Sequence, residues 1–183
     1  AQRQSGRHRL RIGDFARNQS PRVFRHTVFQ NPFVGRWTDA GSTKSWRPDY
    51  VVGITRGGLN PAVMISHYFN VPMYTLNVSL RDSTFGPESN LWMAEEAFGY
   101  DNNPRTTIKC NANLKKKILI VDDINDTGAT LEWIKKDWQA GCLPDAVDWD
   151  YIWGNNVRTA VLTDNLASKA SVDYTVWEVN KAE

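Results

Sequence analysis

One segment of the sequence joins a strand-like apolar run to a cluster of acidic and hydroxyl residues. Residues 118–121 are apolar, and Asp122 and Asp123 follow them directly. A third carboxylate, Asp126, opens a run of small and hydroxyl residues that ends at Thr130, where a helix-like pattern starts. Carboxylates at the end of a strand accept hydrogen bonds from hydroxyl groups, and a helix N-terminus binds phosphate. The segment therefore predicts a binding site for a sugar phosphate.

Alternating apolar segments on both sides of this motif predict strands and helices in turn. Short apolar runs bounded by turn residues favour buried strands, and longer amphipathic runs favour helices. We expect strands at 50–54, 71–78, 118–121, 147–153, 157–162 and 174–179, and helices at 60–69, 91–98 and 130–140. Asn60 and Pro61 are expected to begin the first helix as its cap and first residue, and Gly141 to end the last. This alternation is typical of an α/β fold with a mainly parallel sheet.

The length of 183 residues fits a single domain with a sizeable core. Residues 1–46 are polar, with one short strand or helix expected at 23–33, so we expect a poorly defined basic arm ahead of a domain at 47–183. The arm and Arg47 together hold nine arginines against only two acidic residues. Such an arm can contact nucleic acid or an acidic partner, but a solvated leader is the favoured interpretation.

Residues 81–113 form a polar stretch with two glycines and two prolines. Two interpretations stay open for most of this stretch, because long loops without secondary structure are either functional or disordered. It is a flexible loop over the active site, or it is a disordered insertion.

The cysteines and the hydropathy pattern bear on the compartment. Cys110 and Cys142 have no metal-ligand spacing and form no disulfide framework. No apolar run reaches the roughly 18 residues that a membrane helix needs, and the N-terminus lacks the apolar core of a signal peptide. We therefore expect a cytoplasmic protein with reduced thiols and no membrane partner.

A second loop offers another anion site. Thr55, Arg56, Gly57 and Gly58 follow the strand expected at 50–54. Glycines let backbone amides approach an anion, and arginine supplies a forked donor that matches phosphate oxygens. Asp122 and Asp123, being acceptors only when ionised, suit either sugar hydroxyls or Mg²⁺ with its waters. The sequence thus predicts two phosphate sites with carboxylates nearby.

Taken together, residues 49–59 and 118–130 resemble the type I phosphoribosyltransferases, and most of all the xanthine-guanine type of purine salvage enzyme. The resemblance implies a mainly parallel central sheet flanked by helices, with a small C-terminal hood at 148–183. It implies an Mg²⁺-dependent glycosyltransferase that moves ribose 5-phosphate from phosphoribosyl pyrophosphate onto xanthine, guanine or hypoxanthine and releases pyrophosphate. It also implies a homodimer or homotetramer.

The same resemblance implies a role for each motif residue. Asp122 and Asp123 would hold the ribose hydroxyls and Mg²⁺, directly or through water. Asp126 would accept the ring proton of the base. The peptide beside the arginine would be cis. The pyrophosphate would lie against Thr55, Arg56, Gly57 and Gly58, and the 5-phosphate against Asp126, Thr127, Gly128, Ala129 and Thr130.

The base side of the site departs from the family pattern. Purine-specific members place a lysine after the hood strand, and this chain has Asn165 at the matching point. Those members also end with a strand that stacks on the base, whereas here the sequence stops at Glu183. Either the chain is truncated or its base recognition differs. Asn165 and Trp177 are the candidate base contacts, although packing in a small core is the more ordinary role for Trp177.

Three other functions are alternatives to this one. A non-catalytic regulator with the same fold, binding a nucleotide and nucleic acid, stays open because of the basic arm. A phosphorelay receiver domain does not fit, because too few residues follow Asp123 for a whole domain. A P-loop hydrolase does not fit either, because no Gly-Lys-Ser/Thr follows a glycine loop.

Overall fold

The computed structural model describes residues 46–78, 80, 86–88, 90–101, 105 and 110–181. Nearly all of the expected basic arm, including the element expected at 23–33, lies outside the described residues, as does much of the stretch 81–113. In the described part of the chain, no helix has both the length and the apolar character needed to cross a bilayer.

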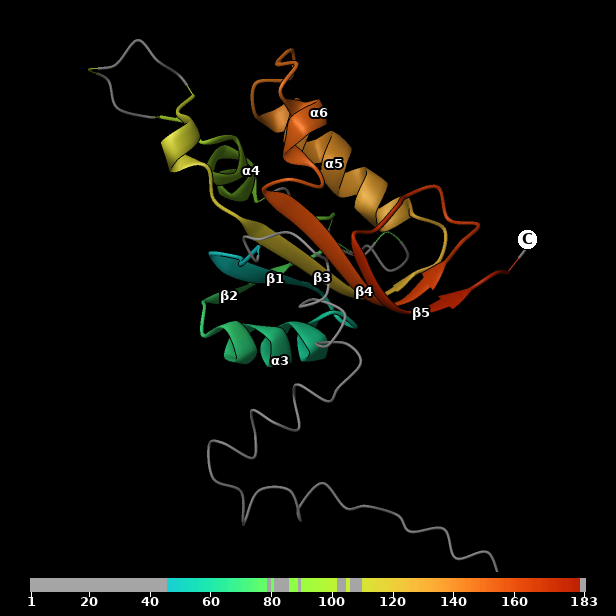
Figure 1. Cartoon of the computed structure of the whole chain (residues 1–183). Coiled ribbons are helices and arrows are strands. Elements are labelled where there is room, and N and C mark those ends of the chain that lie inside the picture. The colour runs from blue at the N-terminus through green and yellow to red at the C-terminus, as the bar shows by residue number, and fades with distance from the viewer. Residues whose placement is uncertain are drawn as a thin grey trace, which may run out of the picture.

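A five-stranded parallel sheet forms the centre of the described structure, in the order β2-β1-β3-β4-β5 (Figure 1). Its strands are β1 Tyr50–Ile54, β2 Met73–Leu76, β3 Ile118–Asn125, β4 Val157–Asn165 and β5 Tyr174–Val179. The expected α/β class and parallel pairing are confirmed. Both β4 and β5 belong to the segment expected to form a hood, and both hydrogen-bond within the central sheet. A separate hood at 148–183 stays a prediction.

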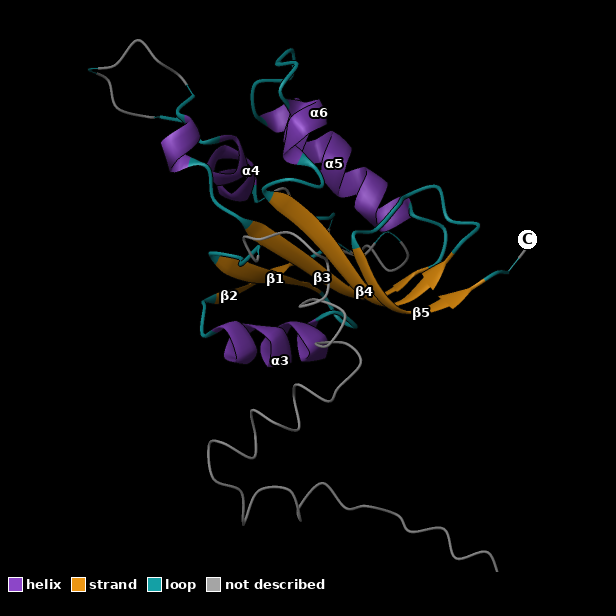
Figure 2. Cartoon of the chain, viewed as in Figure 1, coloured by secondary structure: helices purple, strands orange, loops and turns teal. Residues whose placement is uncertain are grey.

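Helices cover both faces of this sheet (Figure 2). Helix α3 (Leu59–Phe69) lies on one face, and α4 (Leu91–Phe98), α5 (Ala129–Gly141) and α6 (Trp149–Ile152) lie on the other. A short 3-10 helix, η2, spans Ala112–Leu114.

The apolar runs of the strands account for these two layers. Alternate residues of a strand point to opposite faces. In β3, Leu119 packs with Ala62 and Ile65 of α3, while Ile118 and Ile120 pack in the cluster on the other face. Since both faces are covered, the inner strands read as continuous apolar runs rather than as alternating ones.

The strand expected at 147–153 is wrong, because the chain forms α6 there instead. Apolar and acidic residues alternate in this segment, which is the two-residue period typical of a strand. Burial follows helical spacing: Trp149 and Ile152 are buried, whereas Val147 and Tyr151 are 78% and 70% exposed. The indole N–H of Trp149 donates to the carbonyl oxygens of Cys142 and Leu143, at 3.2 Å each, which fixes the turn.

The expected start of α3 is also wrong by two residues. The helix begins at Leu59 with Gly58 as its cap residue and without a side-chain cap, so Asn60 lies in the first turn. Close packing explains the glycine: a Cβ at Gly58 would lie 2.2 Å from the carbonyl oxygen of Val121 in β3. The other expected helices match closely, and α5 ends at Gly141 as expected.

Candidate functional site

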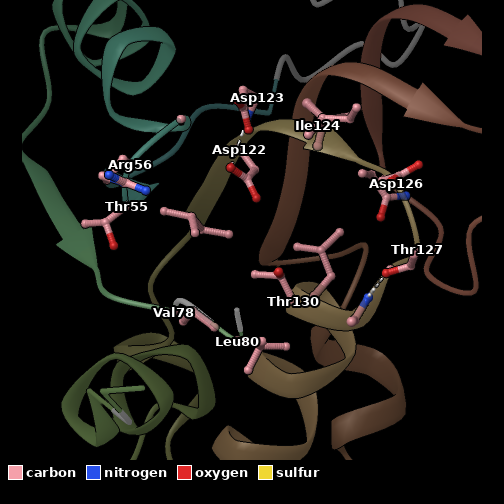
Figure 3. Close-up of a pocket in the computed structure, with 17 residues that line it drawn as sticks. Thr55, Arg56, Val78, Leu80, Asp122, Asp123, Ile124, Asp126, Thr127 and Thr130 are labelled. Carbon is pink, nitrogen blue, oxygen red and sulfur yellow. Dashed lines mark hydrogen bonds between the residues drawn. The ribbon is translucent and has the colours of Figure 1, made fainter. Parts of the chain in front are cut away.

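A cavity of about 400 Å³ opens at the carboxyl ends of β1 and β3, beside the N-terminus of α5 (Figure 3). From β1 the chain leads through α3 to β2, and from β3 it leads through α5 to β4, so the two connections run to opposite sides of the sheet. Parallel sheets bind ligands at such a switch point. The cavity is lined by Ile54, Thr55, Arg56, Gly57, Val78, Leu80, Val161 and residues 122–131.

Figure 3 shows how the predicted residues are arranged around this cavity. The side chains of Thr55 and Arg56 lie on one side, and those of Asp126 and Thr127 on the other. Asp122 lies between the two sides. The structure therefore brings together the two loops that sequence reasoning assigned to phosphate groups, 55–58 and 126–130, on either side of the predicted diol-binding carboxylate.

The end of β3 carries the two adjacent carboxylates. Both are partly buried, and the N–H of Asp123 donates to Oδ1 of Asp122 at 2.9 Å. Burial raises the pKa of Asp122 to about 7; the N–H of Asp123 opposes the rise, and the carboxylate of Asp123 adds to it. A ligand that brings hydroxyl donors or positive charge would stabilise the ionised form of these two carboxylates.

Asp122 and Asp123 are carboxylates of the cavity that could contact a metal ion. Among the described residues, no group of three or more His, Cys, Asp or Glu side chains is arranged to hold a metal ion. Mg²⁺ is commonly held by one or two carboxylates together with substrate phosphates and waters. Asp122 and Asp123 can supply such carboxylate oxygens.

The 126–130 loop carries the features of a phosphate site. Gly128 is the cap residue of α5, with a left-handed φ of 82°, and the 13-residue helix begins at Ala129. The first N–H groups of a helix have no carbonyl partner within it, and they carry the positive end of the helix dipole. The hydroxyl of Thr127 accepts from the N–H of Ala129 at 3.4 Å, which shapes the turn. The loop thus presents backbone donors to the cavity.

The 55–58 loop lies directly against the carboxylates. The peptide between Thr55 and Arg56 is cis, as the resemblance implies. The hydroxyl of Thr55 donates to Asn77 at 2.9 Å, a contact that sequence reasoning missed. A Cβ at Gly57 would lie 2.2 Å from the carboxyl carbon of Asp123, so the glycine lets the loop and the carboxylate touch. The pyrophosphate and ribose sides of the predicted site are therefore adjacent.

Neither predicted base contact lines the cavity. Asn165 is 5% exposed and donates to Asp126, while Trp177 is 59% exposed on the edge strand β5. Their roles toward a base stay predictions. Sequence reasoning also missed Val78, Leu80 and Val161, because apolar lining residues carry no signal that separates them from core residues.

Comparison with known proteins identifies the family of this chain. The family described as phosphoribosyl transferase domain matches residues 37–183. A xanthine-guanine phosphoribosyltransferase of Cereibacter sphaeroides is 32% identical over 101 residues, which cover 55% of this chain and 51% of that protein. The chain thus spans about half the length of this curated relative.

The solved structures that resemble the chain include two phosphoribosyltransferases. The xanthine-guanine-hypoxanthine phosphoribosyltransferase of Helicobacter pylori has a TM-score of 0.50 and 20% identity, and the match covers 89% of this chain and 86% of that one. A purine phosphoribosyltransferase of Pyrococcus horikoshii has a TM-score of 0.46 and 26% identity, covering 73% and 72%. The family model matches most of the length of this chain, which has a parallel sheet with two loops at its switch point. This chain therefore belongs to the phosphoribosyltransferase family, with the type I fold.

Proposed function

We propose that this protein is an Mg²⁺-dependent purine phosphoribosyltransferase, which transfers ribose 5-phosphate from phosphoribosyl pyrophosphate to xanthine, guanine or hypoxanthine and releases pyrophosphate. The observation that carries the proposal is the placement of the carboxylates of Asp122 and Asp123 between two loops built to bind anions. A ribose that carries a phosphate at one end and a pyrophosphate at the other matches this order. The purine preference is supported by the relative named above as a xanthine-guanine enzyme.

The two loops and the carboxylates would fix the donor substrate. The 126–130 loop would bind the 5-phosphate through its backbone N–H groups at the N-terminus of α5. Asp122 and Asp123 would accept hydrogen bonds from the ribose hydroxyls. The 55–58 loop would bind the pyrophosphate, with the guanidinium of Arg56 as a charged, forked donor. Because both ends of phosphoribosyl pyrophosphate would be bound, its anomeric carbon would stay in a fixed position for attack.

The chemical step replaces one bond at the anomeric carbon by another. The bond to the pyrophosphate oxygen breaks, its electron pair leaves with pyrophosphate, and the ring nitrogen of the purine donates the pair of the new bond. Arg56 would stabilise the charge that develops on the leaving group. Asp126 would accept the proton that the purine nitrogen loses. Mg²⁺, when held by Asp122 and Asp123, would supply further positive charge against the pyrophosphate.

Assembly and location complete the proposal. A homodimer or homotetramer, a cytoplasmic location and a closing loop within 81–113 stay predictions.

Replacing Arg56 by alanine is expected to separate ligands that carry pyrophosphate from those that do not. We expect affinity for phosphoribosyl pyrophosphate to fall by about 10- to 100-fold, because a charged hydrogen bond contributes roughly 1.5–3 kcal/mol. Affinity for a purine nucleoside monophosphate should change by less than about threefold, a margin set by the weak effect of a charge not in contact with the ligand. Isothermal titration calorimetry with both ligands measures this difference.

Lys117→Ala is the matched control for this prediction. Lys117 is exposed and precedes β3 at the end of the strand opposite the cavity, so its loss removes the same charge without touching the site. Equal losses for both ligands in Arg56→Ala would place the arginine away from the pyrophosphate.

A further inference from the structure

Asn165, the last residue of β4, is buried and contacts the proposed general base. It is 5% exposed, and its Nδ2 donates to Oδ1 of Asp126 at 3.3 Å. Its Oδ1 accepts from the backbone N–H groups of Ala167, at 3.2 Å, and Lys181, at 3.1 Å. These two donors fix the orientation of the amide, because a flipped amide would lose both bonds and turn its oxygen toward a carboxylate.

The segment that follows Asn165 is held against the 126–130 loop by further bonds. Asn125 is 3% exposed; its Nδ2 donates to the carbonyl of Ala170 at 2.7 Å, and its Oδ1 accepts from the hydroxyl of Ser168 at 3.0 Å. The N–H of Lys169 donates to the carbonyl of Thr127 at 3.3 Å. The segment that follows Asn165 is thus hydrogen-bonded to the residues on both sides of Asp126.

We propose that Asn165 is a positioning residue for Asp126: its anchored amide holds the carboxylate in the orientation that accepts the proton of the incoming base. This inference rests on the proposed function. Asn165 does not line the cavity, which favours an effect through Asp126 over direct contact with a base. A general base acts only when its oxygen is correctly placed relative to the proton it takes, and a small displacement at a reacting centre costs about 100-fold in rate.

Asn165→Asp separates positioning from folding. The new side chain keeps an oxygen for the N–H groups of Ala167 and Lys181, but it replaces the donor that faces Asp126 by a second carboxylate oxygen. We expect kcat to fall by about 10- to 100-fold. The melting temperature should fall as well, because a second carboxylate is buried against Asp126, and a nearly unchanged affinity for phosphoribosyl pyrophosphate shows that the variant still folds. Asn180→Asp is the control, since it adds the same charge at an exposed residue beside Lys181 and should leave kcat unchanged.

A double-mutant cycle identifies the residue through which Asn165 acts. If Asn165 works only by orienting Asp126, then Asn165→Asp should have no further effect on kcat in an Asp126→Asn background. Independent, multiplying losses in kcat, or an unchanged kcat in Asn165→Asp alone, would overturn the inference.

Crystal structures of the wild type and of Asn165→Asp supply a readout that needs no activity. The Asp126 carboxylate should contact Asn165 in the wild type and rotate away in the variant. An Asp126 carboxylate in the same position in both structures overturns the positioning role whatever the kinetics show. A wild type without transferase activity, by contrast, contradicts the proposed function itself, and the crystallographic comparison still decides whether Asn165 orients Asp126.

Discussion

Asp126→Asn is expected to lower kcat by about 100- to 10,000-fold, the range that a positioned general base contributes. The amide of the new residue keeps the size and one acceptor oxygen of the carboxylate, so the 126–130 loop and its contact with Asn165 should persist. Affinity for phosphoribosyl pyrophosphate should therefore change by less than about threefold, because the backbone N–H groups at the helix N-terminus still bind the phosphate.

Single-turnover kinetics together with calorimetry measure the two quantities separately. Asp150→Asn is the matched control, because Asp150 is an exposed carboxylate on α6, outside the cavity lining. Turnover by Asp126→Asn within a factor of about three of the wild type, a far smaller change than loss of a general base produces, would remove Asp126 from proton transfer.

Gly128→Ala should abolish binding of every ligand that carries a 5-phosphate. Gly128 has a φ of 82°, and a Cβ there would lie 2.5 Å from the backbone nitrogen of Ala170 and 2.8 Å from the hydroxyl of Ser168. The left-handed conformation alone costs roughly 1–2 kcal/mol for a residue with a Cβ. The clash forces the 126–130 loop and the segment behind it apart, so we expect a loss of at least about 100-fold in affinity for both phosphoribosyl pyrophosphate and nucleoside monophosphate, as removal of two charged hydrogen bonds would give.

Gly154→Ala controls for backbone strain in this experiment. Gly154 has a similar φ of 79°, but a Cβ there would meet only Asp173 Oδ1 at 3.6 Å, an ordinary contact, and the residue does not line the cavity. It should lower the melting temperature without changing affinity for either ligand. Normal binding of nucleoside monophosphate by a folded Gly128→Ala protein would show that the phosphate lies elsewhere.

Local sequence patterns predicted the residues proposed to bind phosphoribosyl pyrophosphate, because these residues are close together in the chain. An apolar strand, two carboxylates and a glycine before a helix all fall within residues 118–130, and parallel strands bring their carboxyl ends to one edge of the sheet. The 55–58 loop follows the neighbouring strand, so its position next to Asp123 also follows from sheet topology.

The remaining features depend on contacts that no local pattern records. The alternation at 147–153 has the period of a strand, but packing of Trp149 and Ile152 turns it into α6. Gly58 replaces Asn60 as the cap residue because β3 passes too close for a side chain. Asn165 reaches Asp126 across 39 residues of sequence, so its contact becomes visible only when β3 and β4 are paired.

The most direct test of the proposed function is a panel of bases incubated with the full chain, phosphoribosyl pyrophosphate and Mg²⁺, scored for pyrophosphate and nucleotide. We expect pyrophosphate release on the order of 1 s⁻¹ or faster with xanthine, guanine or hypoxanthine, matched mole for mole by the corresponding nucleoside monophosphate, and none when the base is omitted. A chain that binds phosphoribosyl pyrophosphate but releases no pyrophosphate with any base would contradict the enzymatic role and favour a non-catalytic regulator.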